Sequence, residues 1–68
     1  METYSIYHIV QKGLLLNRKC KPIKSYNHAK GIVDSWGYKP VNGAYRVRQA
    51  DIDDHNERMR KVMELIKQ

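Results

Sequence analysis

The chain has 68 residues and one cysteine, so it must fold around a single thin core with no internal disulfide. A chain of this size buries only about 60% of its surface on folding, which leaves little stability in reserve. Hydrophobic residues make up 41% and charged residues 29%, as in ordinary globular proteins, so wholesale disorder is not expected. We predict one domain over residues 1–68. The lone cysteine favours a reducing, cytoplasmic setting over secretion.

Apolar runs are short throughout the chain. The longest are Leu14–Leu16 and Ile9–Val10, whereas a membrane-spanning helix needs roughly 20 apolar residues. No basic and then apolar leader precedes a small-residue cleavage site. We therefore expect no membrane association.

The N-terminal third of the sequence predicts a β-hairpin. Residues 3–10 are rich in β-branched and aromatic side chains, which favours a strand. Lys12-Gly13 supplies the turn, because glycine adopts positive φ without steric cost. A second strand runs from about Leu14 to Lys19 and extends toward Ile23, with Pro22 placing that end on a sheet edge. Cys20 is expected to pack there as a small apolar group, and a pKa lowered by the flanking lysines is the alternative.

The middle of the chain predicts an amphipathic helix over residues 26–36. Its apolar stripe consists of Ala29, Ile32, Val33 and Trp36. Ser25 or Asn27 can cap the start, and Gly37 suits the end. Gly31 weakens a helix interior by about 1 kcal/mol relative to alanine, so close packing is expected at that position.

Two further elements complete the predicted fold. Residues 45–49 alternate as a strand, with Tyr45 and Val47 inward and Arg46 and Arg48 outward. The last helix begins near Asp51, and its early acids and later bases complement the helix dipole. Its apolar stripe is Ile52, Met59, Val62, Met63 and Ile66. The expected architecture is α+β, a single small β-β-α-β-α domain in which a three-stranded sheet packs on one helix. The C-terminal helix either completes that layer or projects from it.

Catalytic and metal-binding signatures are not found in the sequence. The soft metal ligands are His8, Cys20, His28 and His55, which lack the close pairing of a zinc site. The acids of residues 51–54 resemble the start of a calcium loop, but the required glycine does not follow, and helix capping explains them. No glycine-rich phosphate loop or nucleophile elbow occurs. We expect no cofactor, no metal and no enzymatic activity.

The charge distribution is the strongest functional signal. Residues 1–50 hold nine positive and two negative side chains, whereas residues 51–68 hold four and five. A surface of one sign attracts partners of the other sign. The basic residues expected to gather on an exposed sheet face or edge are Arg18, Lys19, Lys21, Lys24, Arg46 and Arg48. Tyr38 or Tyr45 would serve as an aromatic anchor. The ligand is either an acidic protein surface or the phosphates of DNA or RNA.

Two apolar features have more than one interpretation. Trp36 can be a partner-binding knob, but as the last member of a helical stripe it is expected in the core, and Tyr38 is the better candidate for exposure. Met59 and Met63 are expected to pack within the domain. The alternative is that their helix binds a partner or mediates self-association.

Residues 22–48 resemble a known family. Pro22-Ile23 is followed by a helix that ends in Ser35-Trp36-Gly37-Tyr38-Lys39-Pro40, and then by Gly43-Ala44-Tyr45-Arg46-Val47-Arg48. This layout is similar to that of the T7-type phage inhibitors of host RNA polymerase. The resemblance implies a phage-encoded host-takeover protein, working in the host cytoplasm, with Arg46 and Arg48 in contact with a host enzyme. The basic hairpin and the C-terminal helix depart from that pattern.

The sequence therefore predicts a small non-enzymatic interaction module. It binds and modulates a host protein, for example of the transcription machinery, through a basic sheet face. The alternative is a nucleic-acid-binding protein that uses the same face.

Overall fold

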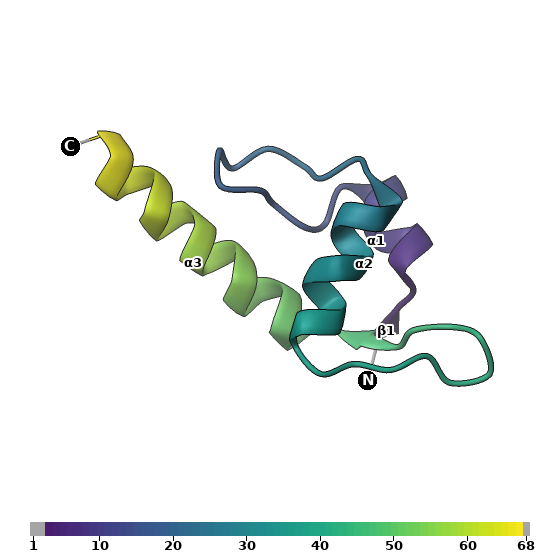
Figure 1. Ribbon diagram of the computed structural model, residues 1–68. Helices are drawn as coiled ribbons and strands as arrows, with labels where there is room; N and C mark the ends of the chain where they lie inside the picture. Colours follow the sequence, from purple (N-terminus) through teal and green to yellow (C-terminus); the bar gives the residue numbers. More distant parts are fainter. Residues whose placement is uncertain (1–2, 68) are drawn as a thin grey trace.

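The computed structural model describes residues 3–67, so residues 1, 2 and 68 of the predicted domain lie outside the described residues. The elements are β1 (Thr3–Tyr4), α1 (Ile6–Lys12), α2 (Tyr26–Ser35), β2 (Val47–Arg48) and α3 (Gln49–Lys67). β1 pairs with β2 in antiparallel register, with Thr3 opposite Arg48 and Tyr4 opposite Val47. The described chain is thus three helices with one two-stranded sheet (Figure 1). The predicted three-stranded sheet packed on one helix is wrong.

The first predicted strand is mostly helix, because a cap at each end outweighs the β propensity of the residues between them. Ser5 keeps an extended backbone, and its hydroxyl accepts a hydrogen bond from the N–H of His8. Gly13 ends α1 in the left-handed conformation, with φ of 64°. Between the caps, Ile6 and Ile9 lie three positions apart and are both buried. Helical spacing therefore places both isoleucines in the core, which strand alternation cannot do.

The second predicted strand is a loop, because side chains of α3 replace a neighbouring strand. Asn56 Oδ1 accepts a hydrogen bond from the N–H of Leu16 over 2.9 Å, and Asn56 Nδ2 donates to the carbonyl oxygen of Leu14 over 2.7 Å. His55 Nε2 lies 2.9 Å from the Leu16 carbonyl oxygen. The segment folds back on itself through one bridge between Leu16 and Pro22. Its polar backbone is thus satisfied without a sheet.

The predicted central helix is confirmed as α2, and Ser25 is its cap. The Ser25 hydroxyl accepts a hydrogen bond from the N–H of His28, while Ala29 and Val33 are buried. The close packing expected at Gly31 is wrong, because a Cβ built there would meet nothing within 4 Å. Gly31 therefore faces open space. It lowers the stability of α2 relative to alanine, and no close contact requires a glycine at this position.

The third predicted strand shortens to β2, but its alternation is confirmed. Tyr45 and Val47 are buried, and Arg46 and Arg48 are exposed. The preceding loop turns at Asn42-Gly43. Both residues have positive φ, as the two central residues of a type I′ β-turn require.

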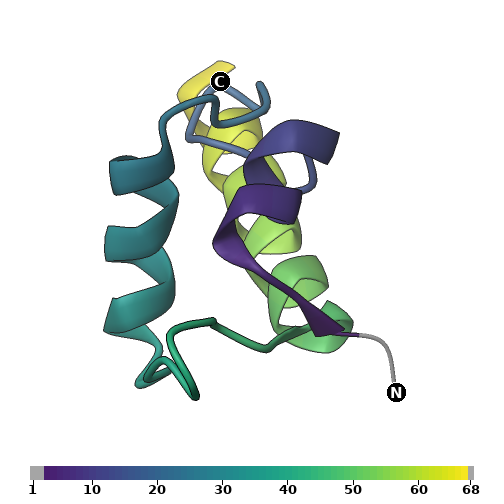
Figure 2. The same ribbon diagram turned by 90° about the vertical axis from the view of Figure 1, so that its right-hand side faces the viewer.

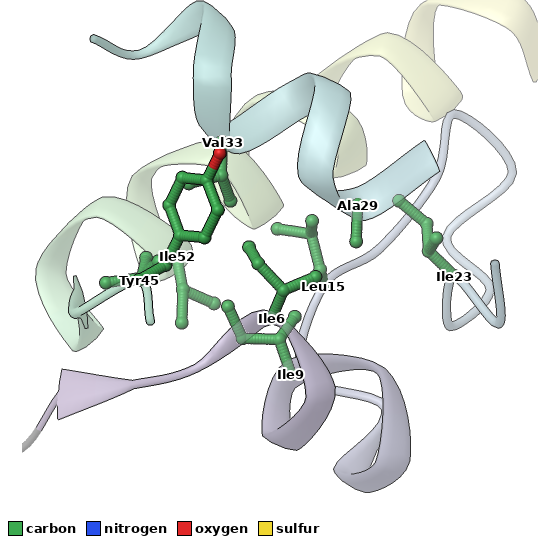
Figure 3. Close-up of a cluster of buried hydrophobic side chains, with 9 residues drawn as sticks. Ile6, Ile9, Leu15, Ile23, Ala29, Val33, Tyr45 and Ile52 are labelled. Carbon is green, nitrogen blue, oxygen red and sulfur yellow. The ribbon is translucent and has the colours of Figure 1, made fainter. Parts of the chain in front are cut away.

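The core is built from all parts of the chain (Figure 3). Its buried members are Ile6, Ile9, Leu15, Ile23, Ala29, Val33, Tyr45, Val47 and Ile52. Trp36 and Tyr38 are half-buried against this cluster. The three helices therefore share one small core, with the sheet at its edge.

α3 both completes the core and projects from it. Its first half carries the buried Ile52 and Asn56, while Leu65 and Ile66 are exposed near its end. Figures 1 and 2 show the C-terminal turns leaving the body beside the loop that joins α1 to α2. The molecule is consequently elongated, with principal extents of 44 × 21 × 19 Å.

Candidate partner-binding site

The loop between α1 and α2 has a tip that is held in place by one asparagine. Asn17 Oδ1 accepts hydrogen bonds from the backbone N–H groups of Lys19 over 2.8 Å and Lys21 over 3.1 Å. The backbone N–H of Asn17 also donates to the carbonyl oxygen of Lys21 over 2.9 Å. Asparagine stabilises turns in this way, so the tip follows a defined path. We name residues 17–24 the basic loop.

Cys20 brings the basic loop against α3. Its φ of 58° is uncommon for a residue that carries a Cβ. The half-buried Sγ lies 3.8 Å from the carbonyl oxygen of Met59. The packing role expected for Cys20 is thus found in a loop contact and not in a strand.

The basic loop displays four exposed cations. They are Arg18, Lys19, Lys21 and Lys24. In the part of the chain that the structure describes, none of them forms an ion pair, whereas Lys30, Arg58 and Lys61 each pair with an acid one helical turn earlier or later. Cations that lack an acidic neighbour within their own protein keep their full attraction for an external anion.

The two arginines of the predicted site lie elsewhere. β2 and the basic loop are at opposite ends of the body, as both views show (Figures 1 and 2). Arg48 Nε donates to the Tyr38 hydroxyl and lies 3.5 Å from Asp51 Oδ2, and this hydroxyl, followed by the carboxylate, raises the pKa of Arg48 above its usual value. Arg46 is exposed. The predicted basic residues therefore form two groups, because the hairpin that would have joined them does not form.

The two tyrosines of the predicted site are bound within the molecule. Tyr45 is only 8% exposed, and its hydroxyl donates to Asp34 Oδ1 over 2.5 Å. That hydrogen bond to a carboxylate raises the pKa of Tyr45. The half-buried Tyr38 donates its hydroxyl to Asp51. Both hydroxyls thus serve internal contacts.

A groove of about 590 Å³ lies beside the basic loop, between α2 and α3. Its apolar lining consists of Leu16, Ile32, Trp36 and Met59, and its polar lining consists of Asn17, Arg18, Lys19, His28, Ser35 and His55. Trp36 is held there by ring contacts with His55 at 5.5 Å and with Tyr38 at 6.4 Å. No acidic side chain is among the described residues that line it. The groove therefore offers an apolar floor beside cations, which suits an anionic ligand with an apolar part.

The sequence interpretation missed this groove because its floor comes from the edges of two apolar stripes. Ile32 lies on α2, Trp36 follows four positions later as the C-cap of that helix, and Met59 continues the stripe of α3. Each was assigned to the core, where apolar residues at helical spacing usually belong. Trp36 and Met59 are instead half-buried. The pattern contained no signal that α2 and α3 would be spread apart by the intervening loop.

A metal-binding cluster and a membrane-spanning helix are not found in the described part of the chain. Among residues 3–67, no group of three or more His, Cys, Asp or Glu side chains could hold a metal ion. None of the helices in that range is both long and apolar enough to cross a membrane. No family model matches the chain, and no curated protein or solved structure is significantly similar to it.

Proposed function

We propose that this protein is a non-catalytic binding module that recognises an acidic segment of a partner protein. The basic loop supplies the charge, and the groove beside it supplies an apolar anchor point. Arg18 and Lys19 belong to both features, since they lie on the loop and line the groove. The single observation that carries the proposal is that unpaired cations and an apolar floor line the same groove.

The chemistry of the floor favours a protein ligand. Trp36 and the neighbouring aliphatic and thioether side chains can receive an apolar side chain, and tryptophan and arginine are enriched where interfaces gain most of their affinity. The cations then fix the ligand's orientation and speed its encounter.

Nucleic acid is the second candidate, and four unpaired cations on one loop are the observation that favours it. If all four contacted phosphates of duplex DNA, the logarithm of affinity would fall with the logarithm of salt concentration with a slope of about −3.6. Fluorescence titration with labelled duplex DNA and single-stranded RNA at two salt concentrations measures this slope. Tight binding with that slope would show that the ligand is a nucleic acid and would reject the proposed protein ligand.

The cellular partner is best sought among bacterial proteins. The resemblance of residues 22–48 to phage inhibitors of host RNA polymerase implies a host protein, for example of the transcription machinery. The layout behind the resemblance includes a strand before α2, and that strand is replaced by the basic loop. The charge of the loop, and not the resemblance, supports the proposal.

The deciding experiment compares two charge-reversed variants in pull-downs from bacterial lysate. Lys19→Glu/Lys21→Glu alters the basic loop, and Lys39→Glu/Arg46→Glu makes the same change of net charge outside it. All four residues are exposed and, in the described chain, free of ion pairs. We expect the first variant to lose acidic partners that the wild type and the second variant retain. Equal loss of partners in both variants would show that binding depends on net charge and not on the basic loop. Unchanged partners in both variants would reject the basic loop as the binding site.

A further inference from the structure

The apolar stripe of α3 continues past the body of the protein. Ile52 and Asn56 on this face are buried, Met59, Val62 and Met63 are half-buried, and Ile66 is 68% exposed. Met59, Met63 and Ile66 follow the spacing i, i+4, i+7, which keeps them on one side of a helix. Since Met59 also lines the groove, the stripe and the groove floor form one continuous surface. We name residues 59–66 of this face the α3 stripe.

The α3 stripe has the composition of a surface that receives another helix. Two of its members are methionines, whose flexible and polarisable side chains adapt to a partner's shape. A row of apolar side chains at helical spacing on a projecting helix is complementary to a second amphipathic helix. From Met59 to Ile66 the row extends about 10 Å at the rise of an α-helix, which is two turns of contact.

The charges beside the α3 stripe decide which helix fits. At about 100° per residue, Arg58 and Arg60 lie on opposite sides of Met59. Arg58 pairs with Asp54 farther round the helix, whereas Arg60 makes no ion pair within the described residues. At the groove end, Arg18 and Lys19 add two more cations. The border of the stripe is therefore cationic around Met59, at the groove end, whereas Glu64 lies beside Met63 at the far end. The cationic end favours a partner that places carboxylates next to it.

We propose that the α3 stripe binds an acidic amphipathic helix of the partner protein, with its apolar anchors on Met59, Met63 and Ile66 and its carboxylates toward the bordering cations. This inference rests on the proposed function and names the form of the ligand. The partner helix lies along α3 and reaches the groove at the Trp36 end of the surface.

The chain offers a matched pair of variants for the test. Ile66→Glu places a carboxylate in the α3 stripe, and Leu65→Glu places the same group one residue away. The two wild-type side chains are similarly exposed, at 68% and 71%, but Leu65 lies about 100° round the helix from Ile66 and outside the stripe. Both variants should fold normally, because exposed substitutions away from special features usually change stability by at most about 0.5 kcal/mol.

The probe is a fluorescein-labelled peptide with leucines at i, i+4 and i+7 and glutamates on its other faces. We expect saturable binding to the full chain, with the affinity reduced about tenfold or more by Ile66→Glu, since a carboxylate is costly to bury, and less than about twofold by Leu65→Glu. The circular dichroism of the peptide should become more helical on binding, because short helices are marginal in water. Equal binding of a peptide of the same composition with scattered leucines would overturn the proposal.

Two further measurements separate this inference from the proposed function. If Lys19→Glu/Lys21→Glu abolishes peptide binding while Ile66→Glu leaves it unchanged, the basic loop remains the binding site and the helical ligand is rejected. If sedimentation shows a dimer of the wild type that Ile66→Glu dissociates, the occupant is a second copy and the acidic helix is rejected. A wild type that stays monomeric at all concentrations supports the foreign helix.

Discussion

Asn56 is the residue on which the path of a distant segment depends. Its side chain satisfies one donor and one acceptor in the backbone of Leu14 and Leu16, 42 and 40 residues earlier in the chain. Asn56 is itself buried. The helical stripe of α3 thus contains one polar residue at a core position, and that residue binds residues 14–16, which lead into the basic loop, to α3.

Replacing Asn56 by alanine should destabilise the protein strongly. Asn56→Ala leaves the partly buried N–H of Leu16 and the partly buried carbonyl of Leu14 without their side-chain partner, which we expect to cost about 2–4 kcal/mol. At the usual stability per residue, the free energy of unfolding of the whole chain is only about 3–10 kcal/mol. Asn56→Ala would therefore remove a large part of it. Urea unfolding followed by circular dichroism measures the change. Asn27→Ala on the exposed side of α2 is the control and should shift stability by at most about 0.5 kcal/mol. Equal effects of the two substitutions would contradict the role given to Asn56.

The Tyr45 hydroxyl should make stability depend on alkaline pH. Because its hydrogen bond to the Asp34 carboxylate raises the pKa of Tyr45, the folded protein holds this proton more tightly than the unfolded chain does. The contribution of this hydrogen bond to the free energy of unfolding is complete below the ordinary tyrosine pKa of about 10. It disappears as the pH rises through the higher pKa of the folded state. The difference in unfolding free energy between wild type and Tyr45→Phe should therefore shrink at alkaline pH. The control is Tyr7→Phe at an exposed tyrosine, which should change the unfolding free energy at neutral pH by at most about 0.5 kcal/mol.

At the scale of elements, the sequence predicted those whose pattern and propensity agree. α2 has a cap, a stripe and a terminating glycine that all favour the same helix, and it was located correctly. The stripe and the charges of the last helix predicted a start near Asp51, and α3 begins slightly earlier, at Gln49, which had been assigned to the preceding strand. The segment of α1 combines β-favouring residues with helix caps at Ser5 and Gly13. The prediction followed the residue types and took Gly13 for a hairpin turn, which gave the wrong element.

The path of residues 14–16, at the start of the loop that joins α1 to α2, could not have been predicted from a local pattern. Leu14–Leu16 has the composition of a strand, but its hydrogen-bond partners are side chains of α3. The groove has the same origin, since residues of this loop line it together with residues of α2 and α3. The cations of the basic loop are close together in the sequence, whereas their separation from Arg46 and Arg48 depends on tertiary structure.

Two glycine substitutions test the local account of these helices, because the same change should have opposite effects. Gly13→Ala forces a Cβ into a left-handed position, with φ of 64°, and brings it to 3.2 Å from Pro22 Cβ. We expect a loss of about 1–2 kcal/mol from the backbone alone. Gly31→Ala meets open space in a helix interior and should gain up to about 1 kcal/mol. Thermal unfolding of both variants measures the signs. A Gly13→Ala variant more stable than the wild type would show that α1 does not end in a left-handed residue at this position.

At the scale of the whole molecule, the body and the projecting half of α3 should differ in stability. α3 has 19 residues and is therefore about 28 Å long, longer than either minor extent of the molecule, 21 and 19 Å. Only its first half contributes a buried apolar side chain to the core, namely Ile52. Helical turns without buried contacts open locally at little cost in free energy.

Native-state hydrogen exchange should make that difference visible along one helix. We expect the amides near Asn56 to exchange only through global unfolding, and the amides that follow Met63 to exchange nearly as fast as in a free peptide. Addition of the acidic helical peptide should slow the second group selectively, because a partner on the α3 stripe would supply the contacts that the body does not. Uniform protection of the amides along α3 in the free monomer would mean that the projecting half is stable by itself. Ligand binding would then not be expected to slow exchange there.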